Sequence, residues 1–291
     1  MQSRNPVFAR AEGFNGRANA YGNQTYAGNG QAYAGYGQAN PYGMPITHAA
    51  VDQRPMTIDS VVQKTGITLL VVFVAAAITW ISTGDITAPG AAGKLYGLAA
   101  AGSMGGFVLA MVNSFKRVIS PGLVIAYAAL EGVAVGAFSK ALENTITVNS
   151  SGHTTSYHGV VIMAVAGTFV SVGATLAAYR FFNIRVGNRF RTWVIAAVWG
   201  FVALSLVDFV LSFFRSDFGF NNPFSPFAIL ISFVGLALGI FMLILDFDFV
   251  ERGVAAGLPE QESWRAAFGL TVTIVWIYIE MLRLAAELTR R

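Results

Sequence analysis

Apolar and polar positions divide this chain into a polar N-terminal part and seven long apolar runs. The runs cover Gly66–Ser82, Leu95–Val112, Pro121–Phe138, Gly159–Tyr179, Thr192–Phe214, Pro226–Asp246 and Trp264–Leu284. Each is close to the roughly 20 residues that a helix needs to cross a hydrocarbon layer about 30 Å thick. None alternates as barrel strands do, and lipid tolerates no backbone group without a hydrogen bond. We therefore expect an all-α, polytopic membrane bundle of about seven transmembrane helices.

The polar N-terminal part differs from the rest in composition. Residues 1–55 are rich in Gly, Tyr, Asn and Gln, whereas residues 56–291 hold the apolar runs. The first part has spaced aromatic residues but no amphipathic period, so it cannot bury enough apolar surface to offset the entropy of ordering. It also lacks the apolar core of a signal peptide. We predict a disordered cytoplasmic tail, solvated rather than self-associating or partner-binding, followed by a seven-helix transmembrane domain.

Overall composition agrees with a membrane protein. Hydrophobic residues make up 55% of the chain and charged residues only 12%, whereas soluble domains carry about 25% charged residues. The net charge of +4 comes from short basic clusters between apolar runs, so we expect a lipid bilayer as partner and no nucleic acid. The chain has no cysteine, which excludes disulfides and thiolate metal sites.

The basic residues between the runs predict the orientation. One set of alternate connections, together with the start of the first run, is much richer in Lys and Arg than the other. The richer set contains Arg54, Lys64, Lys116, Arg117, Arg180, Arg185, Arg189, Arg191, Arg252 and Arg265, and the poorer set contains Lys94, Lys140 and Arg215. By the positive-inside rule the N-terminus is cytoplasmic, in what we expect to be a bacterial inner membrane. Seven spans place Arg290 and Arg291 outside, a mild contradiction that a re-entrant last segment would remove.

Pairs of glycines four residues apart occur within three runs. They are Gly102–Gly106, Gly132–Gly136 and Gly235–Gly239. Such small-residue pairs let helix backbones approach closely. They can serve dimerisation or packing within one bundle; in a chain of seven helices we favour packing, and the oligomeric state stays open.

Acidic residues inside the runs are the candidates for function, because charge within a membrane is costly. They are Glu131 in the third run, Asp208 in the fifth, Asp246 and Asp248 at the end of the sixth, and Glu280 in the seventh, where Arg283 follows on the same helix face. No Lys or Arg lies in mid-span to neutralise Glu131 or Asp208. Each must be protonated, face water or bind a cation. Because the energetic cost of burying a carboxylate recurs in several runs, we interpret these acidic residues as a functional set.

Signals for an enzyme are weak. Ser103 lies in a glycine-rich stretch, but no histidine falls within a run, as an intramembrane serine protease would need. No zinc-ligand spacing occurs within a run either. We predict no enzyme and no cofactor, with calcium as a transported ion.

Several motifs resemble those of a known family. They are Trp276–Leu284 (WIYIEMLRL), Ala128–Ser139 (AALEGVAVGAFS), Leu243–Phe249 (LILDFDF), Ser3–Phe8 (SRNPVF) and Met56–Asp59 (MTID). Their order and spacing resemble the Bax inhibitor-1 (YccA-like) membrane proteins, in particular the bacterial branch. The resemblance covers about residues 55–288 and the first short motif.

This resemblance implies a fold, an activity and a site. The fold is a seven-helix bundle around a central, mostly hydrophobic helix, and the activity is a slow calcium leak governed by pH. In the family, carboxylates on the sixth and seventh helices form a proton-sensitive latch; by position these are Asp246 and Glu280, which would also bind calcium. The family usually has Asp at the position of Glu280, and a basic residue in the second span, which Leu95–Val112 lacks. Asp248 is an alternative to Asp246.

Three hypotheses follow. The first is a cation leak linked to membrane stress or ion homeostasis, held shut while Asp246 and Glu280 share a proton. The second is a proton-coupled transporter of a small solute, with Glu131 and Asp208 as the relay. The third is a regulator that transports nothing and binds membrane proteases through the N-terminal tail.

Overall fold

The computed structural model describes residues 54–84, 90–143, 146–148, 154–156, 159–182, 186–212 and 226–289. Apart from its last two residues, the predicted N-terminal tail lies outside these ranges. Within them, seven helices are long and apolar enough to cross a membrane, which confirms the predicted all-α membrane bundle. They are α2 (Ile58–Ser82), α3 (Ala91–Phe115), α4 (Pro121–Glu143), α5 (Val160–Phe181), α6 (Asn188–Ser212), α7 (Pro226–Ala255) and α8 (Glu262–Thr289).

One feature was not expected from the sequence. Between α4 and α5, the strands β1 (Ile146–Val148) and β2 (Thr154–Ser156) pair antiparallel, with Thr147 opposite Thr155. This short hairpin connects two spans and leaves the fold class unchanged.

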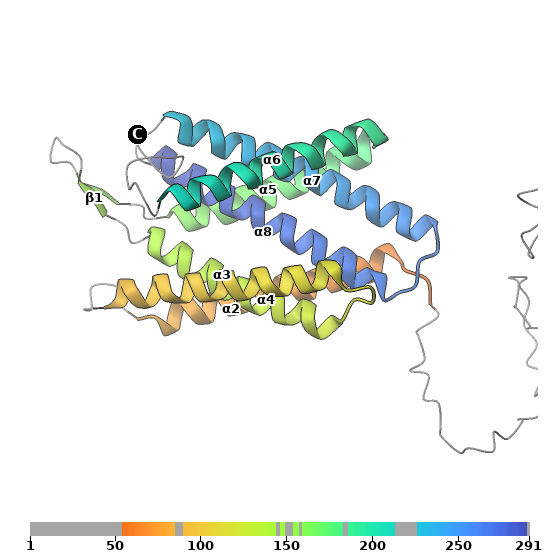
Figure 1. The fold of residues 1–291 in the computed structure, drawn as a ribbon, viewed down its shortest axis with the longest axis horizontal. Helices are drawn as coiled ribbons and strands as arrows, with labels where there is room; N and C mark the ends of the chain where they lie inside the picture. Colours follow the sequence, from red (N-terminus) through yellow and green to blue (C-terminus); the bar gives the residue numbers. More distant parts are fainter. Residues whose placement is uncertain are drawn as a thin grey trace, which may run out of the picture. The chain divides into compact units, whose positions relative to one another are not determined.

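The helix α8 is the centre of the bundle. It packs against α7, α5, α2 and α4, and Figure 1 shows it crossing between a layer of α2, α3 and α4 and a layer of α5, α6 and α7. Half of its apolar window is buried, against 6% for α6. The resemblance implied a central helix, and α8 is that helix.

The last span crosses the whole bundle in the same direction as the first. Ser60 and Ser263 form a hydrogen bond of 2.6 Å, and Thr68 and Thr271 form one of 2.7 Å, each across 203 residues of sequence. A constant offset means that α2 and α8 lie side by side and parallel. A re-entrant last segment, the sequence's alternative, is therefore excluded by a helix that runs unbroken to Thr289.

Glycine pairs bring neighbouring helices of this bundle together. Cβ atoms built on Gly102 and Gly136 would lie 2.8 Å from the Ala134 nitrogen on α4 and 2.5 Å from the Ala76 oxygen on α2. A Cβ on Gly239 of α7 would lie 2.9 Å from a side-chain carbon of α8. All three predicted pairs thus serve contacts within one chain.

Several helices extend beyond their apolar runs. The structure continues α7 to Ala255, so Asp246 lies nine residues inside a helix that the sequence analysis ended at Asp246. The added turns are polar, and ion pairs support them: Asp248 accepts from Arg252 at 3.0 Å, one turn later, and from Arg191 of α6 at 2.8 Å. Apolar content therefore predicts which part of a helix lies in lipid, but it does not predict the residues at which the helix begins and ends.

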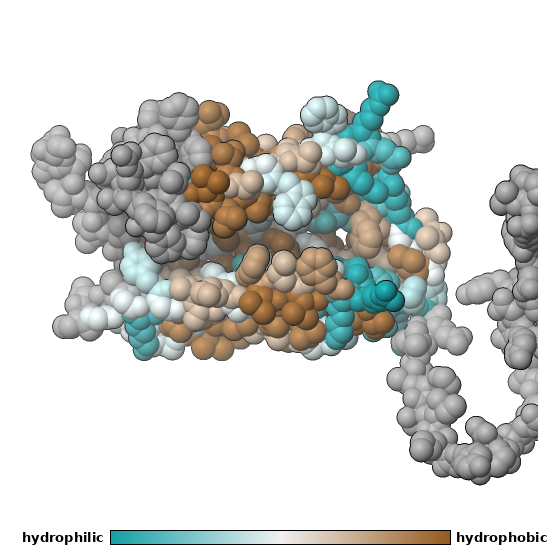
Figure 2. Space-filling model, in the orientation of Figure 1, coloured by the Kyte–Doolittle hydropathy of each residue, from teal (hydrophilic) through white to brown (hydrophobic). Residues whose placement is uncertain are grey.

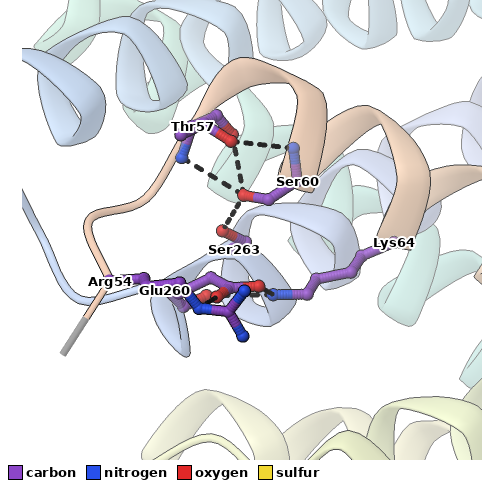
Figure 3. Close-up of polar contacts among 6 residues, drawn as sticks. All are labelled: Arg54, Thr57, Ser60, Lys64, Glu260 and Ser263. Carbon is purple, nitrogen blue, oxygen red and sulfur yellow. Dashed lines mark hydrogen bonds and ion pairs between the residues drawn. The ribbon is translucent and has the colours of Figure 1, made fainter. Parts of the chain in front are cut away.

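The start of α2 is fastened to the turn between α7 and α8 (Figure 3). Lys64 and Arg54 form ion pairs with Glu260 at 3.2 and 3.5 Å. Thr57 and Ser60 cap the first turn of α2 reciprocally, and Ser60 also reaches Ser263. These contacts fix the height at which α8 begins, and hence the depth of every residue along it.

The directions of the helices place most of the basic residues at one end of the bundle. We call this the basic end; it comprises the start of α2, the α3–α4 connection, the end of α5, the start of α6 and the α7–α8 turn. Hydrophilic residues cluster there in Figure 2, beside a broad apolar band over the middle of the visible face. Lys140 lies at the opposite end, where its Nζ donates to the Trp80 and Gly84 carbonyls at 2.6 Å and caps α2.

Candidate functional site

A cavity of about 300 Å³ lies near the basic end, between α3, α7 and α8. Its lining includes Asn113 of α3, Asp246 and Phe249 of α7, and Arg265 and Gly269 of α8. The cavity combines an apolar wall with a few polar groups, as small-molecule and ion sites commonly do. It brings Asp246, the candidate acid of α7, into contact with open space.

Asp246 is bound to α8 by one short hydrogen bond. The Thr273 hydroxyl donates to Asp246 Oδ2 at 2.6 Å, and Thr273 is only 3% exposed. The other oxygen, Oδ1, lies 3.6 Å from where a Cβ on Gly269 would stand. The carboxyl group therefore lies in ordinary contact with Gly269, and its hydrogen bond to Thr273 joins α7 to α8.

Two further polar residues shape the cavity. The Asn113 side chain is 1% exposed; its Nδ2 donates to the Leu123 carbonyl at 3.3 Å, while the buried Oδ1 accepts no hydrogen bond within the described ranges. Arg265 is held by Glu262 at 2.7 Å and by the Arg117 carbonyl at 2.7 Å. The cavity lining therefore includes a buried amide residue, Asn113, and a fixed positive charge at Arg265.

The structure does not bring Asp246 and Glu280 together. Glu280 lies against Gly235 of α7, where a Cβ would be 2.6 Å from the Glu280 carboxyl carbon. Gly235 precedes Asp246 by eleven residues, and Thr273 precedes Glu280 by seven. At 1.5 Å of rise per residue the two carboxyl groups are roughly 10 to 16 Å apart along the helices. The predicted direct contact between Asp246 and Glu280 is therefore not present in this structure. The partner of Asp246 on α8 is Thr273.

Asp248 is not an alternative to Asp246 in the cavity. Its two carboxylate oxygens accept from Arg191 and Arg252, and it is 6% exposed. Arg252 also donates to the Val186 carbonyl at 2.8 Å. Residues two apart on a helix point about 200° apart, so Asp248 faces α6 while Asp246 faces α8. Asp248 thus joins α6 to α7.

The remaining candidates lie apart from each other. Glu131 of α4 faces α3, where a Cβ on Gly106 would stand 2.8 Å from its Oε2. Asp208 lies towards the end of α6 that is opposite the basic end, and it is 6% exposed. Arg283, the suggested partner of Glu280, is exposed and forms no ion pair with it among the described residues. Glu131 and Asp208 belong to helix layers on opposite sides of α8, so they share no site.

Sequence reasoning missed Thr273, Asn113 and Arg265. Neutral hydroxyl and amide residues in apolar runs do not stand out by composition. A usable signal for Thr273 existed, because antiparallel neighbours pair at equal distances from their turn. Counting outward from Leu258 on both sides pairs Asp246 with about residue 270, much nearer to Thr273 than to Glu280.

The cavity offers few oxygen ligands to a metal ion. Within the part of the chain that the structure describes, no three His, Asp or Glu side chains are grouped to hold a metal. Calcium takes six to eight oxygen ligands. Among the lining residues, Asp246, Asn113 and Ser114 offer only a few side-chain oxygens, so a calcium ion here would keep most of its water.

Comparison with known families accounts for nearly the whole chain. The model of the family described as Bax inhibitor 1 like matches residues 5–290. A search of curated proteins returned no significant match. The family predicted from the motifs is confirmed, whereas the bacterial branch stays a prediction. A match of this length, together with seven membrane-spanning helices, shows that the chain is an integral membrane protein of the Bax inhibitor 1 like family.

Proposed function

We propose that the protein is a pH-sensitive leak for calcium or a similar cation, with no enzymatic activity. One observation carries the proposal: an intramembrane carboxyl group, Asp246, lines a cavity near the basic end and is hydrogen-bonded across the α7–α8 seam to Thr273. Intramembrane carboxyls commonly mark ion pathways and proton relays. By the positive-inside rule, the basic end faces the cytoplasm of what we propose is a bacterial inner membrane.

The proposed mechanism starts from the charge of Asp246. When the carboxyl is protonated, the α7–α8 seam is neutral and stays closed to water and ions. When it is ionised, a negative charge lies in an apolar seam, which favours entry of water and a counter-cation from the cavity. The leak therefore increases as pH rises through the titration of Asp246.

The other residues of the cavity set its preference for charge. The carboxylate of Asp246 favours a cation. Arg265 places a positive charge in the same cavity, and its contacts with Glu262 and the α3–α4 connection hold that charge in place. We propose that Arg265 slows cation entry, so that the protein leaks rather than conducts rapidly.

The test is calcium efflux from liposomes that contain the purified protein, measured over a range of pH. Wild type should leak faster at higher pH, and Asp246→Asn should remove the pH dependence. Glu251→Gln is a matched control on the same helix, since the new amide still accepts from Tyr179, whose hydroxyl now donates to Glu251 at 2.6 Å. Wild-type liposomes that leak no faster than empty ones would refute the proposal.

The two rival hypotheses have less support. The transporter needs a relay between Glu131 and Asp208, which lie on opposite sides of the central helix. The regulator that binds membrane proteases depends on the tail, which lies outside the described residues. Deleting residues 1–50 tests it: loss of co-purified membrane partners without loss of calcium efflux would favour a regulatory tail.

A further inference from the structure

Two arginines at the basic end have no acidic partner among the described residues. Arg180 lies in the last turn of α5 and Arg189 in the first turn of α6, and both are exposed. Within the described ranges neither forms an ion pair. By contrast, Lys64 of α2 and Arg265 of α8 form ion pairs with acidic residues at 3.2 and 2.7 Å. The guanidinium groups of Arg180 and Arg189 are therefore available to an anion from outside the protein.

Contacts with α7 bring the end of α5 and the start of α6 to one corner of the bundle. Tyr179 of α5 donates to Glu251 of α7 at 2.6 Å. Arg191 of α6 forms an ion pair with Asp248 of α7 at 2.8 Å. Asp248 and Glu251 are three residues apart, so they are neighbours on one face of α7. The two unpaired arginines, one and two residues away from Tyr179 and Arg191 along the chain, therefore belong to the same corner.

The charges of this corner do not cancel. We call its four arginines the arginine corner; it consists of Arg180, Arg189, Arg191 and Arg252. Two carboxylates lie beside them, those of Asp248 and Glu251, so four positive and two negative charges leave a net charge of +2. The Asp248 side chain is only 9% exposed, against 39% for Arg191 and 49% for Arg252. An anion that approaches the corner therefore meets guanidinium groups before it meets this carboxylate.

Aromatic side chains beside the arginine corner are exposed on the outside of the bundle. Phe181 and Phe182 follow Arg180 directly, and Trp193 follows Arg189 by one turn on the same face of α6. All three rings are at least 76% exposed, and Figure 2 shows hydrophilic residues over the ends of α5 and α6 next to hydrophobic ones. Tryptophan is enriched at the boundary between the hydrocarbon layer and the lipid headgroups. The arginines next to these rings therefore lie at the level of the lipid phosphates.

The chemistry of the arginine corner favours an anionic phospholipid over a zwitterionic one. Arginine presents a planar fork of donors that binds two phosphate oxygens at once. A zwitterionic lipid also carries a phosphate, but its positively charged amine or choline group would meet a corner with a net charge of +2. Phosphatidylglycerol has a phosphate and neutral hydroxyl groups instead, and anionic lipids attract basic residues at the membrane surface.

We propose that the arginine corner binds the headgroup of an anionic phospholipid, with Arg180 and Arg189 on its phosphate and Trp193 beside its acyl chains. The complementary charge and the exposed aromatic residues support this occupant. The proposed site is separate from the cavity at Asp246 and does not depend on the leak.

Binding of phosphatidylglycerol with a fluorescent acyl chain tests the proposal without any transport measurement. The full-length protein in a neutral detergent is titrated, and binding is followed by fluorescence anisotropy. Each basic residue near an anionic lipid surface contributes about fivefold to binding, so the double variant Arg180→Gln/Arg189→Gln should bind roughly 25-fold more weakly than wild type.

The double variant Lys116→Gln/Arg117→Gln is the matched control. It removes the same charge from the same end of the bundle, at exposed positions in the α3–α4 connection. This connection belongs to the other helix layer (Figure 1), and at about 0.15 M salt exposed charges more than about 8 Å apart are largely screened. The control should therefore keep the affinity of wild type.

Four results would overturn the proposal. Equal loss of affinity in both double variants would show a diffuse attraction to the whole basic end. Phosphatidylcholine that competes as well as phosphatidylglycerol would remove the preference for anionic lipid, and glycerol phosphate that competes equally would indicate a site for free phosphate. If the arginine variant does not fold, wild type decides, because an affinity that is unchanged between about 0.05 and 0.5 M salt would exclude a charge-based site.

Discussion

Replacing Thr273 by valine probes the hydrogen bond on which the proposed gate depends. Valine keeps the shape of the side chain but removes the hydroxyl that donates to Asp246 Oδ2 at 2.6 Å. A hydrogen bond to a charged group contributes about 1.5–3 kcal/mol and one between neutral groups about 0.5–1.5 kcal/mol. The substitution therefore disfavours the ionised form over the protonated form by about 1–1.5 kcal/mol.

This free-energy difference predicts a shift in the pH dependence of the leak. About 1.4 kcal/mol corresponds to one pH unit in a titration. Because Thr273→Val penalises the ionised, open form, the midpoint of calcium efflux should move to higher pH by about one unit. The assay is efflux from liposomes containing a calcium-sensitive dye, measured at closely spaced pH values with equal amounts of protein.

Thr271→Val is the matched control. Thr271 is also buried on α8, but it faces α2, where it forms a hydrogen bond of 2.7 Å with Thr68. Its loss should lower the stability of the fold by about 1 kcal/mol and leave the efflux midpoint unchanged. If Thr273→Val has the wild-type midpoint, or if both valine variants shift it equally, Thr273 does not set the titration of Asp246.

Three further predictions concern packing and charge. Gly136→Ala should lower the melting temperature in detergent, since its Cβ would meet the backbone of Ala76 at 2.5 Å and overpacking costs about 1–3 kcal/mol; Gly173→Ala, with nothing within 4 Å, should be neutral or slightly stabilising. Lys140→Met should destabilise by about 1–3 kcal/mol in the same assay, because it removes the ammonium donor from the Trp80 and Gly84 carbonyls and leaves Trp80 only the Thr83 hydroxyl; an unchanged melting temperature would contradict that cap. Asp248→Asn should reduce stability by about 1–3 kcal/mol, as it weakens two partly exposed arginine contacts, yet keep the wild-type pH profile of efflux, and a flattened profile would place Asp248 in the gate.

Much of the fold could be predicted from the sequence, for a physical reason. Lipid requires long apolar segments and satisfied backbone groups, so Pro226–Asp246 and the other six runs predict helices with little ambiguity. The ends of the helices could not be predicted in this way. The continuation of α7 to Ala255 depends on an ion pair between α6 and α7, which is a tertiary contact.

The candidate site was only half predictable. Asp246 stands out because a carboxylate in an apolar run is costly. Its partner does not, since Thr273 is one of many small polar residues that are tolerated in transmembrane helices. Whether Asp246 meets Thr273 or Glu280 depends on the register between α7 and α8, and the turn held by Glu260 fixes that register.

Cysteine modification beside Asp246 tests most directly whether the leak passes through this cavity. The chain has no cysteine of its own, so Gly269→Cys introduces a single thiol next to the carboxyl, where a Cβ has an ordinary contact of 3.6 Å. A membrane-impermeant thiol reagent added at the basic end should label this variant and stop calcium efflux. The same reagent on Asp59→Cys, an exposed position at the start of α2, should label fully and leave efflux unchanged. Complete labelling of Gly269→Cys with undiminished, still pH-dependent efflux would contradict the proposal that the cavity at Asp246 is the ion pathway.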